Sequence, residues 1–420
     1  SGFSFSFLWR RERERGVEGN MVETGDATRV RWAYVFLFSS LGIFSPYLPL
    51  FYAHLGLSKA QIGVLTGLAP MVILFASPTI TAIADACQGR KQVLIIGAVV
   101  GTLARLAVLG FGSSFLQLLP FIVLFSSATA ALPPLMDSLA VDSCTSNYGS
   151  LRAWGCVGFG LSSLLGGFLV SDGTFWRIFM GQSLCCAALV SVLFTYKGEP
   201  KQHSAEKHDE ISDNILKRLG KLFGRSDVRL FFPLVLLSGM FNGGIDAFLF
   251  VRLKELGAIG LCFGLARAIN CASEVPFFYS SRPLIERLGL FNVMAVAQCA
   301  YVIRFITYSF ISNPWTVLPV EALHGMTFAA FYASSVYFVR AVAPPGSTTT
   351  MQGLLSALYW GTGYGGGALL GGFVYEHLGV EIMYTGAAGL AAVGCCLALL
   401  LSRTSTLTNE DIFRENELQA

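Results

Sequence analysis

Long apolar stretches alternate with short polar segments along almost the whole chain. A helix needs about 20 apolar residues to cross the ~30 Å hydrocarbon core of a bilayer. Stretches of that length lie near residues 32–52, 61–83, 93–111, 116–138, 153–171, 175–196, 229–251, 258–280, 291–311, 315–339, 351–375 and 381–401. The pattern predicts an all-α, polytopic membrane protein with twelve transmembrane helices.

The composition supports this prediction. Of the 420 residues, 54% are hydrophobic and 13% are charged, whereas roughly 25% are charged in an average soluble domain. This excludes an ordinary soluble enzyme and a disordered chain. The net charge is only +3 and the basic residues are scattered, so no basic surface is expected for nucleic acid. We expect a monomer whose partners are the lipid bilayer and a small-molecule substrate.

The polar segments divide the chain into two halves. Residues 197–228 are the one long polar segment between predicted spans, and we interpret them as a cytoplasmic linker. It joins an N-terminal six-helix half, residues 31–196, to a C-terminal six-helix half, residues 229–402. Residues 1–30 and 403–420 are expected to be cytoplasmic tails.

The distribution of basic residues predicts the orientation in the membrane. Most of the 29 Lys and Arg lie in the two tails and in every second loop, whereas the remaining loops hold only Lys59, Arg177, Arg252 and Lys254. Because basic residues are retained on the cytoplasmic side, we expect both termini to be cytoplasmic.

Two glycine-rich sequences occur once in each half. GFGLSSLLGGF (158–168) corresponds to GYGGGALLGGF (363–373), and IGVLTGLA (62–69) corresponds to IGLCFGLA (259–266). Small residues allow membrane helices to approach closely, so we interpret the glycines as sites of tight helix packing. They lack the context of a phosphate-binding loop. A repeated six-plus-six bundle is typical of alternating-access carriers.

Five segments carry a resemblance to a known family: PYLPLFYAHLGLSKAQIGVL (46–65), IADACQGRKQVL (83–94), LRAWGCVGF (151–159), EALHGMTFAAF (321–331) and QGLLSALYWGTGYGGGALLGGF (352–373). They resemble the major facilitator superfamily, in particular the branch of lactose permease with its nucleoside and phenylpropionate relatives and the related eukaryotic orphan carriers. The resemblance covers about residues 30–402 and implies the major facilitator fold.

The second of these segments is similar to the gating motif that the superfamily carries between its second and third spans. Asp85, Gly89, Arg90 and Lys91 match the motif. Thr81 stands where a glycine is usual, and the spacing from Asp85 to Gly89 is one residue longer than in the family. The resemblance implies a gating role for the four matching residues.

Charged residues within the predicted spans are the main functional signal, because a charge at the bilayer centre costs about 2.5–3.5 kcal/mol on insertion scales. Asp137 ends span four and Arg152 begins span five, with Cys156 and Phe159 on the same helical face as Arg152. The resemblance to lactose permease implies that this acid and this arginine hold substrate hydroxyls and that Phe159 stacks on the substrate. The alternative is a gate or folding ion pair near the cytoplasmic face.

A second group of ionisable residues lies in the C-terminal half and comprises Glu274, Arg304, Glu321 and His324. Desolvation favours a protonated carboxyl and a nearby arginine favours the ionised form, so this set suits proton coupling. The resemblance implies that Arg304 and His324 match the permease. The permease's proton-carrying glutamate has Thr327 in its place, so we expect Glu321 or Glu274 to carry the proton. Buried structural ion pairs are the alternative.

Three further predictions concern polar residues in the spans. Asn242 and Asp246 share a face of span seven and are expected to line the cavity opposite span ten. Arg105 and Arg267 are interpreted as members of buried structural ion pairs, or as arginines that snorkel or hold neighbouring carbonyls. Glu376 is expected to be a solvated or capping charge.

These patterns predict a secondary active transporter that moves a small polar solute, such as a sugar, nucleoside or aromatic acid, with protons as the coupling ion. The alternative is an uncoupled facilitator or a ligand-sensing transceptor. An enzyme is not expected, because the sequence contains no HExxH, GxSxG or cysteine-based metal pattern. No cofactor is expected.

Overall fold

The computed structural model describes residues 25–112, 114–143, 148–171, 173–196, 224–344, 347–405, 407 and 412–413. All regular secondary structure within these residues is helical, so the predicted all-α class is confirmed. The predicted linker falls mostly outside the described residues, and the next helix begins at Ser226. The first described helix begins at Gly25, seven residues before the predicted span.

The N-terminal half contains six helical passages, some of them broken. In chain order its elements are α2 (Gly25–Gly42), η1 (Ser45–Tyr47), α3 (Leu48–His54), α4 (Lys59–Ala86), α5 (Arg90–Phe111), α6 (Phe115–Thr129), α7 (Leu132–Ser143), α8 (Tyr148–Leu169) and α9 (Trp176–Thr195).

The C-terminal half repeats this arrangement with one additional short helix, α13. Its elements are α11 (Ser226–Glu255), α12 (Gly260–Tyr279), α13 (Ser281–Leu288), α14 (Leu290–Phe310), η3 (Pro314–Thr316), α15 (Val317–Glu321), η4 (Gly325–Ala330), α16 (Phe331–Val342), α17 (Thr348–Ser356), η5 (Ala357–Gly363), α18 (Tyr364–Leu378) and α19 (Val380–Thr404). Each of the twelve predicted stretches therefore coincides with one helix or with consecutive helical segments.

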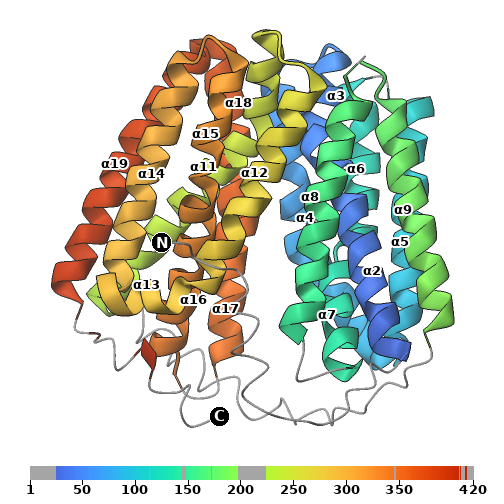
Figure 1. Ribbon diagram of the computed structural model, residues 1–420, viewed down its shortest axis with the longest axis horizontal. Helices are drawn as coiled ribbons and strands as arrows, with labels where there is room; N and C mark the ends of the chain where they lie inside the picture. Colours follow the sequence, from blue (N-terminus) through green and yellow to red (C-terminus); the bar gives the residue numbers. More distant parts are fainter. Residues whose placement is uncertain are drawn as a thin grey trace, which may run out of the picture.

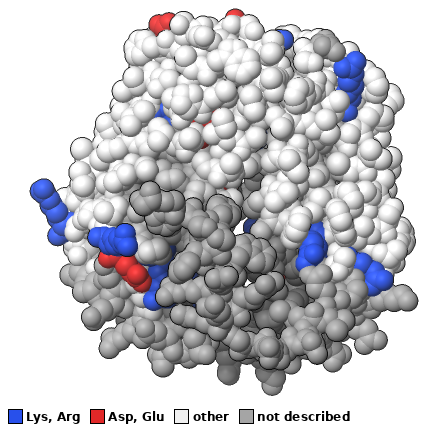
Figure 2. Space-filling model, in the orientation of Figure 1, with Lys and Arg blue, Asp and Glu red and all other residues white. Residues whose placement is uncertain are grey.

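The helix lengths and the distribution of charges are those of a membrane-spanning protein. Among the described residues, eight helices are long and apolar enough to cross a membrane by length and composition. We call the face where α3 ends and α4 begins the upper face, and the face where α2 begins and α19 ends the lower face (Figure 1). On the side shown in Figure 2, described charges gather toward these two faces, and the band between them is largely uncharged.

Several passages are broken where the sequence disfavours a straight helix. Pro46 lies in the short 3₁₀ segment η1, and Pro133 and Pro134 occupy the first turn of α7, where a missing N–H costs least. The tenth and eleventh passages each contain a π-helical segment, η4 and η5. Such segments are rare and often mark functional sites, and both lie beside the polar groups described below.

The repeated glycine sequences pack against each other across the two halves. A Cβ atom at Gly63 of α4 would lie 2.5 Å from the carbonyl oxygen of Ala368 in α18, and one at Gly67 would lie 2.6 Å from that of Gly365. Gly167 of α8 meets Gly260 of α12 even more closely. No larger side chain fits in this arrangement, so the interpretation of the glycines as tight packing sites is confirmed.

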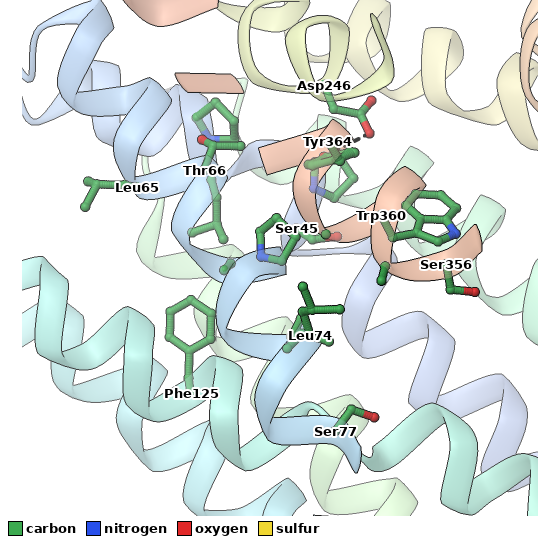
Figure 3. Close-up of a pocket in the computed structure, with 18 of the residues that line it drawn as sticks. Ser45, Leu65, Thr66, Leu74, Ser77, Phe125, Asp246, Ser356, Trp360 and Tyr364 are labelled. Carbon is green, nitrogen blue, oxygen red and sulfur yellow. Dashed lines mark hydrogen bonds between the residues drawn. The ribbon is translucent and has the colours of Figure 1, made fainter. Parts of the chain in front are cut away.

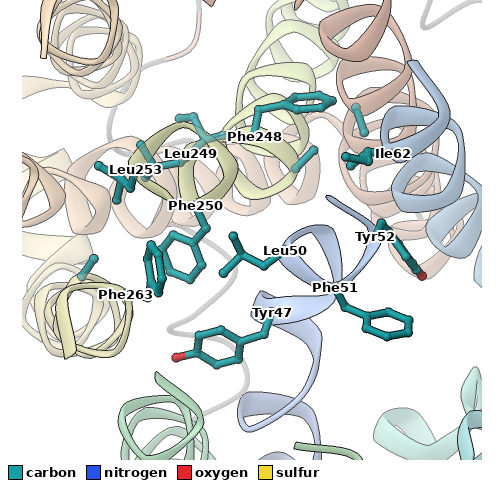
Figure 4. Packing of buried hydrophobic residues seen from close by; sticks show 14 of the residues in the cluster. Tyr47, Leu50, Phe51, Tyr52, Ile62, Phe248, Leu249, Phe250, Leu253 and Phe263 are labelled. Carbon is teal, nitrogen blue, oxygen red and sulfur yellow. The ribbon is translucent and has the colours of Figure 1, made fainter. Parts of the chain in front are cut away.

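Apolar packing closes the upper part of the interface between the halves (Figure 4). Tyr47 and Leu50, from η1 and α3, belong to one buried cluster with Phe250 of α11 and Phe263 of α12. The ring centroids of Tyr47 and Phe250 are 5.8 Å apart. In Figure 1 the two groups of helices lie closest at the upper face and draw apart toward the lower face.

Four polar residues at the upper face also join the halves, and we call them the upper lock: Lys59, Glu255, Tyr375 and Glu376. Lys59 Nζ lies 2.5 Å from Glu255 Oε1, and Tyr375 OH donates to Glu255 Oε2 at 2.5 Å. The backbone N–H of Lys59 donates to Glu376 Oε2 at 2.6 Å. Glu376 therefore has the capping role expected of it, on a helix of the opposite half.

Candidate functional site

A cavity of about 640 Å³ lies between the two halves. Its lining from the N-terminal half comprises Ser45, Pro46, Leu48, Pro49, Tyr52, Leu65, Thr66, Ala69, Pro70, Ile73, Leu74, Ser77, Pro78, Phe125 and Phe159. The C-terminal half contributes Asp246, Arg267, Gly353, Ser356, Ala357, Trp360, Gly361 and Tyr364. This volume is in the range of small-molecule sites, and the position between two repeats is where carriers bind their solutes.

One end of the cavity is polar and is formed by the C-terminal half. Asp246 of α11 accepts a hydrogen bond from Arg267 Nη2 at 2.8 Å through Oδ1 and from Tyr364 OH at 3.1 Å through Oδ2. Figure 3 shows Asp246 and Tyr364 together at this end, away from Phe125 and Leu74. We call Asp246, Arg267 and Tyr364 the polar end of the cavity. The prediction that Asp246 lines the cavity is therefore correct.

Arg267 forms a buried ion pair, which is one of the two roles predicted for it. Its guanidinium lies inside the protein, with its charge compensated by Asp246 and with the ring of Phe250 at 5.8 Å. The alternative role, snorkelling, was wrong. The partner acid lies 21 residues away on another helix, and a single-helix pattern does not reveal which acid it is. Asp246 and Arg267 are the only charged side chains among the described residues that line the cavity.

The remaining wall is mostly apolar and carries several aromatic rings. Trp360 comes from η5, Phe159 from α8, Phe125 from α6 and Tyr52 from α3. The rings of Trp360 and Tyr364 lie 6.2 Å apart between centroids. Phe159 therefore enters the cavity as predicted.

A buried network in the C-terminal half contains the predicted proton-coupling residues. Arg304 Nη2 donates to Glu321 Oε2 at 3.1 Å, Arg304 Nη1 lies 3.2 Å from His324 Nδ1, and Arg304 Nε donates to Tyr308 OH at 2.8 Å. Tyr308 in turn donates to Glu321. The side chains of Arg304 and Glu321 are fully buried. Thr327 accepts from Arg304 Nη1 at 2.8 Å, so its hydroxyl takes a place in the network where the permease has a glutamate.

His324 connects this network to Glu274 of α12. His324 Nε2 lies 3.2 Å from Glu274 Oε1. The Glu274 side chain retains 24% of its exposure, in contrast to Glu321. Glu274 lies two helical turns beyond Arg267 on the same face of α12. The chain of contacts thus runs from the fully buried acid Glu321 to the partly exposed acid Glu274.

Asn242 does not line the cavity as predicted. Its side chain is buried and donates a hydrogen bond to the hydroxyl of Tyr359 in η5. The i, i+4 spacing placed it correctly on the same face of α11 as Asp246. Asn242 lies one helical turn before Asp246, and at that position Tyr359 separates it from the cavity. The sequence pattern does not show this contact with another helix.

The Asp137–Arg152 pair also lies outside the cavity. Arg152 Nη1 donates to Asp137 Oδ2 at 2.6 Å and Tyr34 OH donates to Asp137 Oδ1 at 2.6 Å. The Arg152 side chain is half exposed, and Cys156 is exposed without lining the cavity. Seven residues, about 10 Å of helix, separate Arg152 from Phe159. The predicted single binding face on α8 is therefore divided, and only Phe159 reaches the cavity.

The gating motif forms a compact turn at the lower face. Arg90 Nε donates to Asp85 Oδ1 at 2.7 Å, and Arg90 Nη1 donates to Ser138 of α7 at 2.7 Å. Lys91 Nζ donates to the carbonyl oxygen of Tyr196 at 2.7 Å, and Gly89 is the N-cap of α5. The motif therefore ties the loop between α4 and α5 to neighbouring helices of its own half.

Arg105 of α5 has an environment that the sequence did not indicate. It is buried between the rings of Phe44 and Phe125, at 5.2 and 5.1 Å from their centroids. No acid pairs with it among the described residues. It lies behind the cavity wall formed by Phe125.

Comparison with known proteins identifies relatives of the same architecture. The model of the MFS_1 like family matches residues 27–385. The maltose permease of Geobacillus stearothermophilus is 27% identical over 90% of this chain and 95% of its own. The major facilitator superfamily domain-containing protein 6-like protein B of Xenopus laevis is 25% identical over 68% of this chain and 47% of its own. A crystal structure of the nucleoside transporter NupG aligns with a TM-score of 0.77 at 18% identity, covering 91% of this chain and 100% of that one.

Proposed function

Because the chain belongs to the MFS_1 like family of the major facilitator superfamily, we propose that it is a secondary active transporter that moves a small polar solute by alternating access, coupled to protons. The observation that carries the proposal is the central cavity, which lies between two repeated halves and is closed at the upper face. A maltose permease is among its relatives, and a nucleoside transporter shares its fold.

The closing contacts support alternating access. At the upper face the halves are joined by glycine packing, an apolar cluster and the two contacts that Lys59 makes in the upper lock. The motif at Asp85 and Arg90 instead bonds within one half at the lower face. Rocking the halves about the cavity would break the first set and bring the lower ends together. Since the described residues of the basic loops, among them Arg90, Lys91 and Arg287, lie at the lower face, we propose that this face is cytoplasmic and that the conformation is inward-facing.

The buried network supports proton coupling. Glu274 is the one member of the acid–His–Arg chain that combines a carboxyl group, partial exposure and a titratable partner, His324. A proton on Glu274 would change the charge two turns from Arg267, which lines the cavity. We therefore assign proton binding to Glu274, with Arg304, Glu321 and His324 fixing its surroundings.

Uptake into proteoliposomes tests the proposal. The probes are maltose, uridine and phenylacetate, each measured with and without an imposed pH gradient. Accumulation of one probe above its external concentration only when the outside is acidic supports proton-coupled transport. Equilibration that ignores the gradient would identify an uncoupled facilitator, and no uptake of any probe by a folded protein would oppose transport.

A further inference from the structure

At the polar end of the cavity, Arg267 has N–H donors without an acceptor, whereas each carboxylate oxygen of Asp246 already accepts a hydrogen bond. Both carboxylate oxygens of Asp246 already accept a hydrogen bond, from Arg267 and from Tyr364. Arg267 has five N–H donors, and only one of them has an acceptor among the described residues. Its Nε is buried without a partner. The Nη1 group and the second N–H of Nη2 therefore remain to bind an additional acceptor, and an anionic one bonds most strongly to a guanidinium.

The rest of the cavity offers little to a ligand with many hydroxyl groups. Ser45 already donates to the carbonyl oxygen of Leu41 at 2.8 Å, and the hydroxyl of Ser356 lies 3.3 Å from that of Tyr332. Thr66 lines the cavity, but its hydroxyl is buried without a partner. Beyond the polar end, a sugar would meet only these hydroxyls and those of Tyr52 and Ser77 on a mostly apolar wall, and each sugar hydroxyl left unpaired is costly.

The apolar wall instead suits a ring. Trp360, Phe159 and Phe125 line the cavity from three different elements, and Trp360 and Phe125 lie on different sides of it in Figure 3. Aromatic rings attract one another in offset and edge-to-face arrangements beyond the effect of buried area alone. A flat, apolar solute body can therefore pack here, provided that its polar group is confined to the end near Asp246.

We infer that the transported solute is an aromatic monocarboxylate, whose carboxylate binds the free edge of Arg267 while its ring packs against Trp360 and Phe159. This inference rests on the proposed transport function and names its substrate class. The Arg267 fork can hold one carboxylate in a bidentate manner while still contacting Asp246, and Tyr364 keeps its hydrogen bond to Asp246.

Binding to the purified protein tests the substrate class. The probes are benzoate, phenylacetate and 3-phenylpropionate, with phenylacetamide as the ring without a charge and acetate as the charge without a ring. At millimolar concentration at least one ring acid should raise the melting temperature, because a ligand that binds the native state stabilises it. Phenylacetamide should require about a 10- to 100-fold higher concentration for the same shift in melting temperature, and acetate should not shift it. No shift with any ring acid would overturn the inference.

Variants test the assigned residues. Arg267→Gln alone leaves Asp246 unpaired and is a risk to folding, so the double variant Asp246→Asn/Arg267→Gln removes both charges together. It should bind the ring acid about 10- to 100-fold more weakly. Arg282→Gln removes an arginine from the exposed pair with Glu286 on α13 and should leave binding unchanged. Wild-type affinity in the folded double variant would overturn the inference.

Uptake separates this inference from the proposed function. If proteoliposomes accumulate uridine or maltose but no ring acid, the substrate class is wrong and the transport function stands. If a ring acid binds at Arg267 but is not transported, whether or not a gradient is imposed, the transport function is wrong and the binding site stands.

Discussion

Nε2 of His324 lies 3.2 Å from Oε1 of Glu274, and this contact connects a partly exposed acid with a fully buried charge network. Replacing Glu274 with Gln keeps a hydrogen-bonding side chain but removes the proton-binding group. We expect Glu274→Gln to abolish uphill transport and to leave exchange of internal for external solute intact, since exchange requires no net proton movement.

Exchange and uphill uptake of whichever probe the wild type accumulates should be measured on the same proteoliposomes. Glu286→Gln, on the exposed surface of α13, is the matched control and should behave as wild type. Loss of exchange together with uphill uptake would mean that Glu274 has a structural or ligand-binding role instead.

Substitution of Glu321 should destabilise the protein more than substitution of Glu274. Its side chain is fully buried and bonds to both Arg304 and Tyr308. Glu321→Gln leaves the Arg304 charge without its buried acid, and breaking such a pair costs about 3–5 kcal/mol. We expect a clearly lower melting temperature for Glu321→Gln and a nearly unchanged one for Glu274→Gln. Equal melting temperatures of the two variants would contradict the assignment of a structural role to Glu321 alone.

The Asp137–Arg152 pair should act as a scaffold outside the binding site. Because Arg152 is half exposed, we expect each single neutralisation to cost only about 1 kcal/mol of stability and to reduce transport without changing solute affinity. Asp137→Arg combined with Arg152→Asp should restore most of the transport rate. Affinity lost in both single variants and not recovered in the exchanged pair would return these residues to the binding site.

Phe159 should contribute to solute affinity. Stacking on an aromatic ring contributes on the order of 1–3 kcal/mol, so Phe159→Ala should weaken affinity about 10- to 100-fold, while Phe159→Trp should retain it. Phe168, an exposed residue on the same helix, supplies the control Phe168→Ala, for which no change is expected. Unchanged affinity in a normally expressed Phe159→Ala variant would eliminate the stacking role.

The helices and the charge network were predictable, whereas the shape of the cavity was not. Hydrophobic length determines a membrane helix almost alone, so the twelve stretches match the observed helices. Arg304, Glu321 and His324 were grouped correctly, because charges within spans must find partners. The contacts of the network with Tyr308 and Thr327, however, became visible only in three dimensions.

The errors share one physical cause. Periodicity assigns residues to a helix face but does not show which helix covers that face. Asn242 and Asp246 share a face of α11, yet Tyr359 covers one and the cavity exposes the other. The partner of Arg267 could not be identified for the same reason, because it lies on a different helix. A tryptophan and a tyrosine four residues apart, Trp360 and Tyr364, were the available signal for a second cavity wall.

The central claim is that the two halves rock between an arrangement closed at the upper face and one closed at the lower face. Gly260 offers a test that needs no ligand, because its Cβ position overlaps the carbonyl oxygen of Gly167 in the opposite half. Gly260→Val should therefore prevent upper closure. Gly386→Val, where a Cβ meets nothing within 4 Å, is the control.

The decisive measurement is a pair of spin-label distances in lipid nanodiscs, in a background without exposed native cysteines. One label pair, at His54 and Lys254, reports on the upper face, and the other, at Gln88 and Leu288, reports on the lower face. We predict that Gly260→Val lengthens the upper distance and shortens the lower one, while Gly386→Val changes neither. A folded Gly260→Val protein in which the upper distance grows with no change below, or in which neither distance changes, would contradict alternating access.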